Sequence, residues 1–127
     1  MSVATILVVD DNPTNLKLVS DVLEFDGYRI LKASDAEEAQ EIVRSATPDL
    51  ILMDIALPGM DGLTLTRRLK NDEATRHIVI VALTAFAMKG DDEKARVAGC
   101  DGYITKPIDT RKLSASVADY LHLGEQT

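Results

Sequence analysis

Five side chains in this sequence could act together on a phosphoryl group. Asp10, Asp11 and Asp54 carry carboxylates, Thr84 carries a hydroxyl and Lys106 an ammonium group. Each stands at the end of a short run of aliphatic and β-branched residues. Carboxylate oxygens suit a hard cation such as Mg²⁺, and an ammonium group suits phosphoryl oxygens. These residue types predict phosphoryl chemistry around a divalent cation, provided that the fold brings them together.

The apolar runs before these residues are expected to be buried parallel strands. Strands are predicted near residues 5–9, 28–33, 49–53, 78–83 and 102–105. Helix-like segments alternate with them, and the clearest one begins with Asn12 as N-cap and Pro13 at the first helical position. The other helices are expected from Ala36 to Ala46, near 62–71, near 87–98, and through Leu113, Val117, Tyr120 and Leu121.

The alternation predicts an α/β fold in which a five-stranded, doubly wound parallel sheet carries helices on both faces. Right-handed crossovers limit the topology to a doubly wound sandwich. Among such folds we expect the flavodoxin-like (βα)5 arrangement, with the strand order 2-1-3-4-5. In such a sheet the carboxyl ends of the strands meet at one edge, where ligands bind. The five functional side chains should therefore meet at that edge.

The composition is that of one ordinary globular domain. The 127 residues are expected to form a single unit with a core over about 5–121, and too few residues follow to make an output domain. The formal charge of −7 argues against binding to nucleic acid or to an anionic membrane, because both need basic surface. Cys100 is the only cysteine, and neither a signal peptide nor a membrane span is evident. We therefore expect a cytoplasmic protein.

Each functional residue also has an ordinary structural interpretation. Asp10 and Asp11 could favour the dipole of the following helix. Thr84 could cap a strand, and Lys106 could be a solvated loop lysine. Asp54 changes this balance, because three carboxylates at one edge repel each other unless a cation lies among them or one is protonated. A carboxylate also forms aspartyl phosphates as a nucleophile, and Asp54 is the predicted nucleophile.

Other residues are expected to have structural roles. Arg67, Arg68 and Lys70 are interpreted as the solvated face of the helix near 62–71. Cys100 is interpreted as a small core residue. Gly62 is expected to permit the start of the helix that follows the predicted nucleophile.

Four stretches, in this order, resemble the receiver domain of two-component response regulators. They are Ile6–Asn12, Asp49–Gly62, Leu83–Ala85 and Gly99–Pro107. The resemblance covers roughly residues 5–121, and the segment Thr84–Gly90 is most similar to single-domain regulators of the DivK type. It implies a signalling module that accepts a phosphoryl group stoichiometrically and is not an enzyme.

This resemblance also implies roles for individual residues. Asp54 would accept the phosphoryl group from a sensor histidine kinase or a histidine phosphotransfer protein. Mg²⁺ would be ligated by Asp11, Asp54 and the backbone carbonyl of Ala56, with Asp10 acting through a water molecule. Lys106 would contact the phosphoryl group, as part of the machinery that assists the transfer.

The resemblance further implies a switch. Thr84 would turn toward the new phosphoryl oxygens, and Tyr103 would move inward behind it. The Lys106–Pro107 peptide is expected to be cis. Kinases would dock near the first helix, and a downstream protein target would bind the face formed by the fourth helix, the fifth strand and the fifth helix.

Three alternatives stay open from the sequence. A Mg²⁺-dependent aspartate-nucleophile phosphatase would carry a second Asp two residues after the first, where this chain has Asn12. A flavodoxin-type flavin carrier needs a hydroxyl- and glycine-rich phosphate loop, where Asp10 and Asp11 would repel a phosphate without metal. A scaffold that is never phosphorylated would lack a member of the site, and none is missing.

Overall fold

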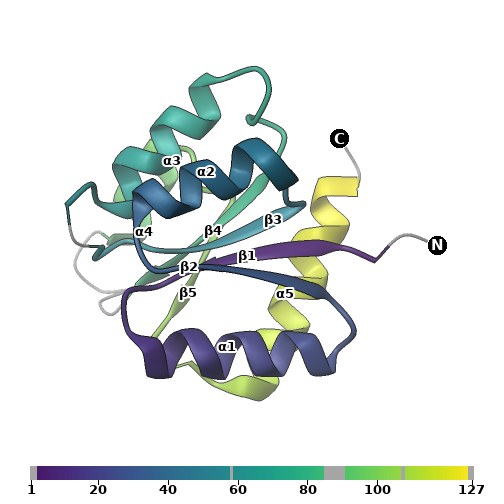
Figure 1. Cartoon of the computed structure of the whole chain (residues 1–127). Coiled ribbons are helices and arrows are strands. Elements are labelled where there is room, and N and C mark those ends of the chain that lie inside the picture. Colours follow the sequence, from purple (N-terminus) through teal and green to yellow (C-terminus); the bar gives the residue numbers. More distant parts are fainter. Residues whose placement is uncertain (1–2, 58, 85–90, 107, 126–127) are drawn as a thin grey trace.

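The computed structural model describes residues 3–57, 59–84, 91–106 and 108–125, and it shows strands alternating with helices (Figure 1). The strands are β1 (Thr5–Val9), β2 (Arg29–Ala33), β3 (Leu50–Asp54), β4 (Val79–Thr84) and β5 (Gly102–Thr105). The helices are α1 (Pro13–Phe25), α2 (Ala36–Ala46), α3 (Gly62–Asn71), α4 (Asp91–Ala98) and α5 (Thr110–Glu125). Every predicted strand is present within one residue of its predicted bounds, whereas the predicted start of the fourth helix lies outside the described residues.

The strands form one parallel sheet in the order β2-β1-β3-β4-β5, which confirms the predicted topology. The three central strands are almost entirely buried, as their continuous apolar runs predict, and the edge strands β2 and β5 are only partly buried. Asp54 pairs with Leu83, and Thr84 pairs with Thr105. The register therefore aligns the carboxyl ends of β3, β4 and β5.

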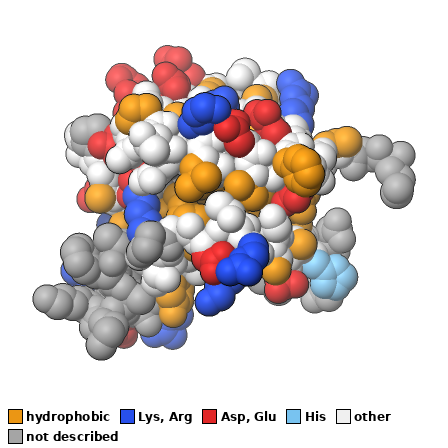
Figure 2. Space-filling view, turned by 90° about the horizontal axis from the view of Figure 1, so that it is seen from below, with side chains coloured by type: hydrophobic (Ala, Val, Ile, Leu, Met, Phe, Trp, Pro, Cys, Tyr) orange, Lys and Arg blue, Asp and Glu red, His pale blue; other side chains and the backbone are white. Residues whose placement is uncertain are grey.

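Two layers of helices cover the sheet, with α1 and α5 on one face and α2 and α3 on the other (Figure 1). Successive strand residues point to opposite faces, so Ile6 and Val8 pack toward α1 and α5 while Leu7 and Val9 pack toward α2 and α3. On the outer side of the α1 and α5 layer, acidic, basic and hydrophobic side chains are interspersed (Figure 2). None of the described helices is long and apolar enough to cross a lipid bilayer.

The buried side chains described on the fourth helix are small. It contacts α3, β4 and β5, and the buried side chains described on it are Ala95 and Ala98. Val97 on the same helix is largely exposed. The chain leaves α4 through Gly99, whose φ of 106° lies in the region that favours glycine.

Side-chain caps start α1 and α3 at the carboxyl edge of the sheet. Asn12 accepts hydrogen bonds from the N–H groups of Thr14 and Asn15, with Pro13 in the first turn, as predicted. The N-cap of α3 is Asp61, which accepts from a backbone N–H in the first turn. The amino ends of both helices, which carry partial positive charge, therefore lie at this edge.

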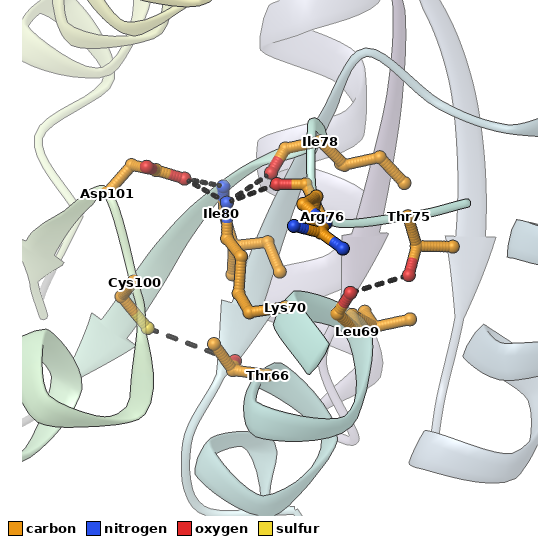
Figure 3. A network of polar contacts seen from close by, with 9 residues as sticks. All are labelled: Thr66, Leu69, Lys70, Thr75, Arg76, Ile78, Ile80, Cys100 and Asp101. Carbon is orange, nitrogen blue, oxygen red and sulfur yellow. Dashed lines mark hydrogen bonds and ion pairs between the residues drawn. The ribbon is translucent and has the colours of Figure 1, made fainter. Parts of the chain in front are cut away.

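The prediction that Lys70 belongs to the solvated face of α3 is wrong. Its side chain is only 18% exposed, and its Nζ donates to the carbonyls of Arg76 at 3.1 Å and Ile78 at 2.7 Å (Figure 3). The same ammonium lies 2.8 Å from Asp101 Oδ2, which also accepts from the N–H of Ile80. The partners are distant in sequence, so helical periodicity alone could not reveal them. The two arginines of α3 are exposed, as predicted.

Lys70→Met should lower the free energy of unfolding by about 2–3 kcal/mol, because hydrogen bonds to charged groups contribute about 1.5–3 kcal/mol and their loss leaves acceptors unsatisfied. Methionine preserves most of the stem, so the change reports mainly on the ammonium. Urea unfolding followed by circular dichroism measures the difference. The control is Lys17→Met, which removes an exposed ion pair with Asp21 and should leave stability nearly unchanged. Equal losses in both variants would contradict the special role of Lys70.

Candidate functional site

The carboxyl ends of β1 and β3 bring three carboxylates together. Asp54 is the last residue of β3, and Asp10 and Asp11 directly follow the neighbouring strand β1. One oxygen of each carboxylate lies within 4.8 Å of the others. Asp10 and Asp54 are buried, whereas Asp11 is exposed. The structure therefore forms the predicted acidic cluster, with solvent access at Asp11.

Backbone N–H groups hold the two buried carboxylates in place. The N–H of Asn12 donates to Asp10 Oδ1 at 2.9 Å, and the N–H of Ala56 donates to Asp54 Oδ1 at 3.0 Å. Each donor stands two residues after its carboxylate, in the turn that an aspartate forms with its own backbone. Neither donor was predicted, although an aspartate at the end of a strand is a signal for such a turn.

Lys106 directly follows β5, and its side chain extends to the acidic cluster. Its backbone N–H donates to the carbonyl of Thr84 at 2.7 Å, next to the β4–β5 pairing. Its Nζ lies 3.0 Å from Asp54 Oδ2 and 3.5 Å from Asp10 Oδ2. Burial lowers the pKa of Lys106, but the hydrogen bond and charge of Asp54, joined by Asp10, raise it above its ordinary value. The ammonium group is therefore a counter-ion for both buried carboxylates.

Asp10 is held in a demanding environment. The pKa of its carboxyl is raised above the ordinary value, chiefly by burial and then by the charge of Asp54. The hydrogen bond from the N–H of Asn12 and the charge of Lys106 lower this pKa but do not cancel the increase. Its buried Oδ2 makes no hydrogen bond among the described residues, although the ammonium of Lys106 is 3.5 Å away. Burying a charged oxygen without such a bond is unfavourable. A divalent cation with oxygen ligands would offset this charge, so these residues fit Mg²⁺.

The predicted switch residues lie on neighbouring strands. Thr84 is buried at the end of β4. Tyr103 on β5 is 42% exposed, and with Tyr120 it lines a cleft of about 540 Å³ between α4 and α5. The predicted cis peptide between Lys106 and Pro107 lies outside the described residues.

The sheet and its acidic edge occur together in a known protein family. A family model of the response regulator receiver domain matches residues 6–118. The chain belongs to this receiver domain family. The polar-differentiation response regulator DivK of Brucella ovis is 45% identical over 117 residues, which make up 92% of this chain and 95% of that protein. DivK of Brucella anthropi is 44% identical with the same coverage.

Solved structures of receiver domains share this fold. The receiver domain of a Pseudomonas aeruginosa sensor histidine kinase, solved with a magnesium ion coordinated in its active-site cleft, has a TM-score of 0.87 at 34% identity and covers 95% of this chain and 99% of that chain. A receiver domain protein of Methanospirillum hungatei has a TM-score of 0.90 at 30% identity and covers 98% of each chain. This receiver domain is therefore a phosphoacceptor signalling module, similar to DivK.

Without metal, Asp10→Asn should make the receiver domain more stable at neutral pH. Because the pKa of Asp10 is raised from its ordinary 3.8 in the folded state, the folded protein holds this proton more tightly than the unfolded chain. Wild-type stability should thus fall as pH rises from that value through the folded pKa, whereas asparagine does not ionise. Urea unfolding in EDTA between about pH 3 and pH 8 measures the difference, which should vanish at the acid end. A less stable variant at pH 7 would contradict the prediction.

Proposed function

We propose that Asp54 is the residue that accepts the phosphoryl group. The observation that carries this proposal is the placement of its carboxylate. The side chain is buried at the end of β3, its Oδ2 lies 3.0 Å from Lys106 Nζ, and the carboxylates of Asp10 and Asp11 are beside it. An ammonium group and a cation-binding cluster around one nucleophile can stabilise the charge of a phosphoryl group during transfer.

The proposed donor is a phosphohistidine of a sensor histidine kinase or of a histidine phosphotransfer protein. An oxygen of Asp54 attacks the phosphorus atom, a P–O bond forms, and the P–N bond breaks with its electron pair remaining on the imidazole. Lys106 then contacts an oxygen of the transferred group. Each protein molecule accepts one group, so it acts as a stoichiometric acceptor that assists its own transfer and not as an enzyme.

Mg²⁺ is the proposed cofactor. Its ligands are Asp11, Asp54 and the backbone carbonyl of Ala56, with Asp10 acting through a water molecule. The hard oxygen donors, the exposed Asp11 and the buried Oδ2 of Asp10 support this choice. So does the magnesium ion in the cleft of the Pseudomonas receiver domain. When bound, Mg²⁺ offsets the negative charge of the incoming phosphoryl group.

Signal output is proposed to pass through Thr84 and Tyr103. The hydroxyl of Thr84 donates to a phosphoryl oxygen, and Tyr103 moves inward behind it. The face formed by α4, β5 and α5, which carries Tyr103 and its cleft, is the proposed docking surface for a downstream protein. The kinase or phosphotransfer protein docks near α1. The charge of −7 supports protein partners and disfavours nucleic acid and anionic membranes, which need basic surface. A cytoplasmic setting is part of the proposal.

No observation favours the Mg²⁺-dependent aspartate-nucleophile phosphatase. Asn12 stands where such an enzyme would carry its second Asp, and its side chain accepts from Thr14 and Asn15 as the cap of α1. A phosphatase would turn over a small phosphodonor repeatedly. A receiver domain would take up one phosphoryl group and lose it slowly.

Asp54→Asn should abolish labelling by acetyl phosphate, because asparagine keeps the shape of the side chain but removes the nucleophile. Wild-type labelling should require Mg²⁺ and should stop at one phosphoryl group per chain. Intact-protein mass spectrometry measures both quantities. The control Asp21→Asn changes an exposed aspartate of α1 and should label normally. Labelling of Asp54→Asn at the wild-type level would show that another residue is the acceptor.

Thr84→Ala should still be labelled on Asp54 but should fail to move Tyr103. In the wild type, inward movement of the ring should slow nitration of Tyr103 several-fold once the protein is labelled. In the variant, labelling should leave the nitration rate unchanged. Peptide mass spectrometry gives the rate at Tyr103, and Thr105→Ala, an exposed hydroxyl on β5, is the control that should behave as wild type. Normal protection of Tyr103 in Thr84→Ala would rule out the proposed switch.

A further inference from the structure

A buried hydroxyl in α3 connects the start of that helix to the segment before β5. Thr66 is fully buried, and its Oγ1 donates to the carbonyl of Gly62 at 2.8 Å, one turn earlier. The thiol of Cys100 lies 3.8 Å from the same Oγ1 and donates to it (Figure 3). Burial raises the pKa of the Cys100 thiol, so it keeps the proton that it donates. The hydroxyl is thus held from both sides.

The first turn of α3 rests directly on the backbone of the proposed phosphoacceptor. A Cβ atom on Gly62 would clash with the carbonyl oxygen of Asp54 and would lie 2.9 Å from Ile55 Cα. The N–H of Gly62 points at the carbonyl of Ile55, 3.4 Å away. A shift of Gly62 toward β3 would therefore displace the backbone of Asp54 and Ile55.

A second contact one turn further along α3 fixes the same partner segment. Lys70 pairs with Asp101, the residue after Cys100, and Asp101 also accepts from the backbone of β4. Thr66, Lys70, Cys100 and Asp101 form what we call the α3 seam. The α3 seam fixes the position of α3 relative to β4 and β5. Because Gly62 at the start of α3 packs against the backbone of Asp54, the seam also influences where Asp54 lies.

We propose that Thr66 is a positioning residue for Asp54, an inference that rests on the proposed role of Asp54. A threonine that donates to the carbonyl four residues earlier bends its helix. Here the hydrogen bond from the Thr66 hydroxyl constrains the carbonyl of Gly62, and the contact with the Cys100 thiol fixes the orientation of that hydroxyl. The hydroxyl thereby sets how the first turn of α3 lies against residues 54 and 55. The Asp54 carboxylate and the Ala56 carbonyl follow that backbone to the places where metal and phosphoryl group bind.

Packing alone does not explain a hydroxyl at this position. Valine has the same shape as threonine and would fill the space without a polar group to bury. Thr66→Val leaves no cavity but removes one neutral hydrogen bond and one weak thiol contact, so the expected loss of stability is small. Transfer rates, by contrast, are sensitive to position, since a misplacement of 1 Å can slow a reaction about 100-fold. A large change in rate with only a small loss of stability separates positioning from structural support.

The test compares Thr66→Val, which removes the hydroxyl, with Thr66→Ser, which keeps it. We expect Thr66→Val to be labelled by acetyl phosphate about tenfold more slowly than the wild type, in keeping with a displacement well below 1 Å. It should also bind Mg²⁺ alone more weakly in a calorimetric titration. Thr66→Ser should restore both values nearly to the wild type. The control is Thr64→Val on the same helix, whose hydroxyl has no hydrogen bond among the described residues and which should change neither value.

Cys100→Ala removes the other side of the contact and gives an independent test. It should slow labelling less than Thr66→Val, and the double variant should be no slower than Thr66→Val alone, because the two residues act as a unit. Wild-type rates and Mg²⁺ affinity in Thr66→Val would overturn the inference, as would a serine variant as slow as the valine variant. Failure of the wild type itself to be labelled would instead overturn the proposed function of Asp54.

Discussion

Negative charge gathered at one edge of the sheet is the constraint around which this receiver domain is organised. Asp10 and Asp54 are buried side by side, with Asp11 at the surface. This crowding is tolerated because backbone N–H groups, the ammonium of Lys106 and the positive ends of α1 and α3 all face the same edge. The short apolar strands serve the same purpose, since they carry these groups to one place and add no further charge to the interior.

The opposite edge of the sheet uses charge in a different way. There Asp49 accepts from the N–H of Thr5 at 2.8 Å, and Asp101 accepts from Ile80 while it pairs with Lys70. Each of these carboxylates accepts from a backbone N–H of a neighbouring strand, which ties the amino ends of the strands together. The carboxyl edge differs, because a buried oxygen of Asp10 makes no hydrogen bond among the described residues. Ionisable groups in such surroundings are typical of functional sites.

Local patterns were enough to predict the strands, their order and the meeting of the acidic residues with Lys106. The strands follow from apolar runs, and the rule that parallel strands end at one edge relates even Asp54 and Lys106, which are 52 residues apart. The α3 seam was not predictable in this way. No such rule relates a helix side chain to a residue before a strand, so only the assembled fold shows that Lys70 meets Asp101 and that Thr66 meets Cys100. Lys70 follows two exposed arginines on α3, so the sequence alone predicts an exposed lysine.

The small buried side chains described on α4 affect how far a small change at the site can be carried. Ala95 and Ala98 hide little area, so shifting the part of the helix that carries them costs little at about 25 cal/mol per Å². Its carboxyl end is tied down through Cys100 and Asp101. A rod of 8 residues spans about 12 Å, so a rotation of about 10° about the tied end displaces the other end by about 2 Å. If a change at Asp54 rotated α4 in this way, the displacement of its amino end would be large enough for a partner protein to detect.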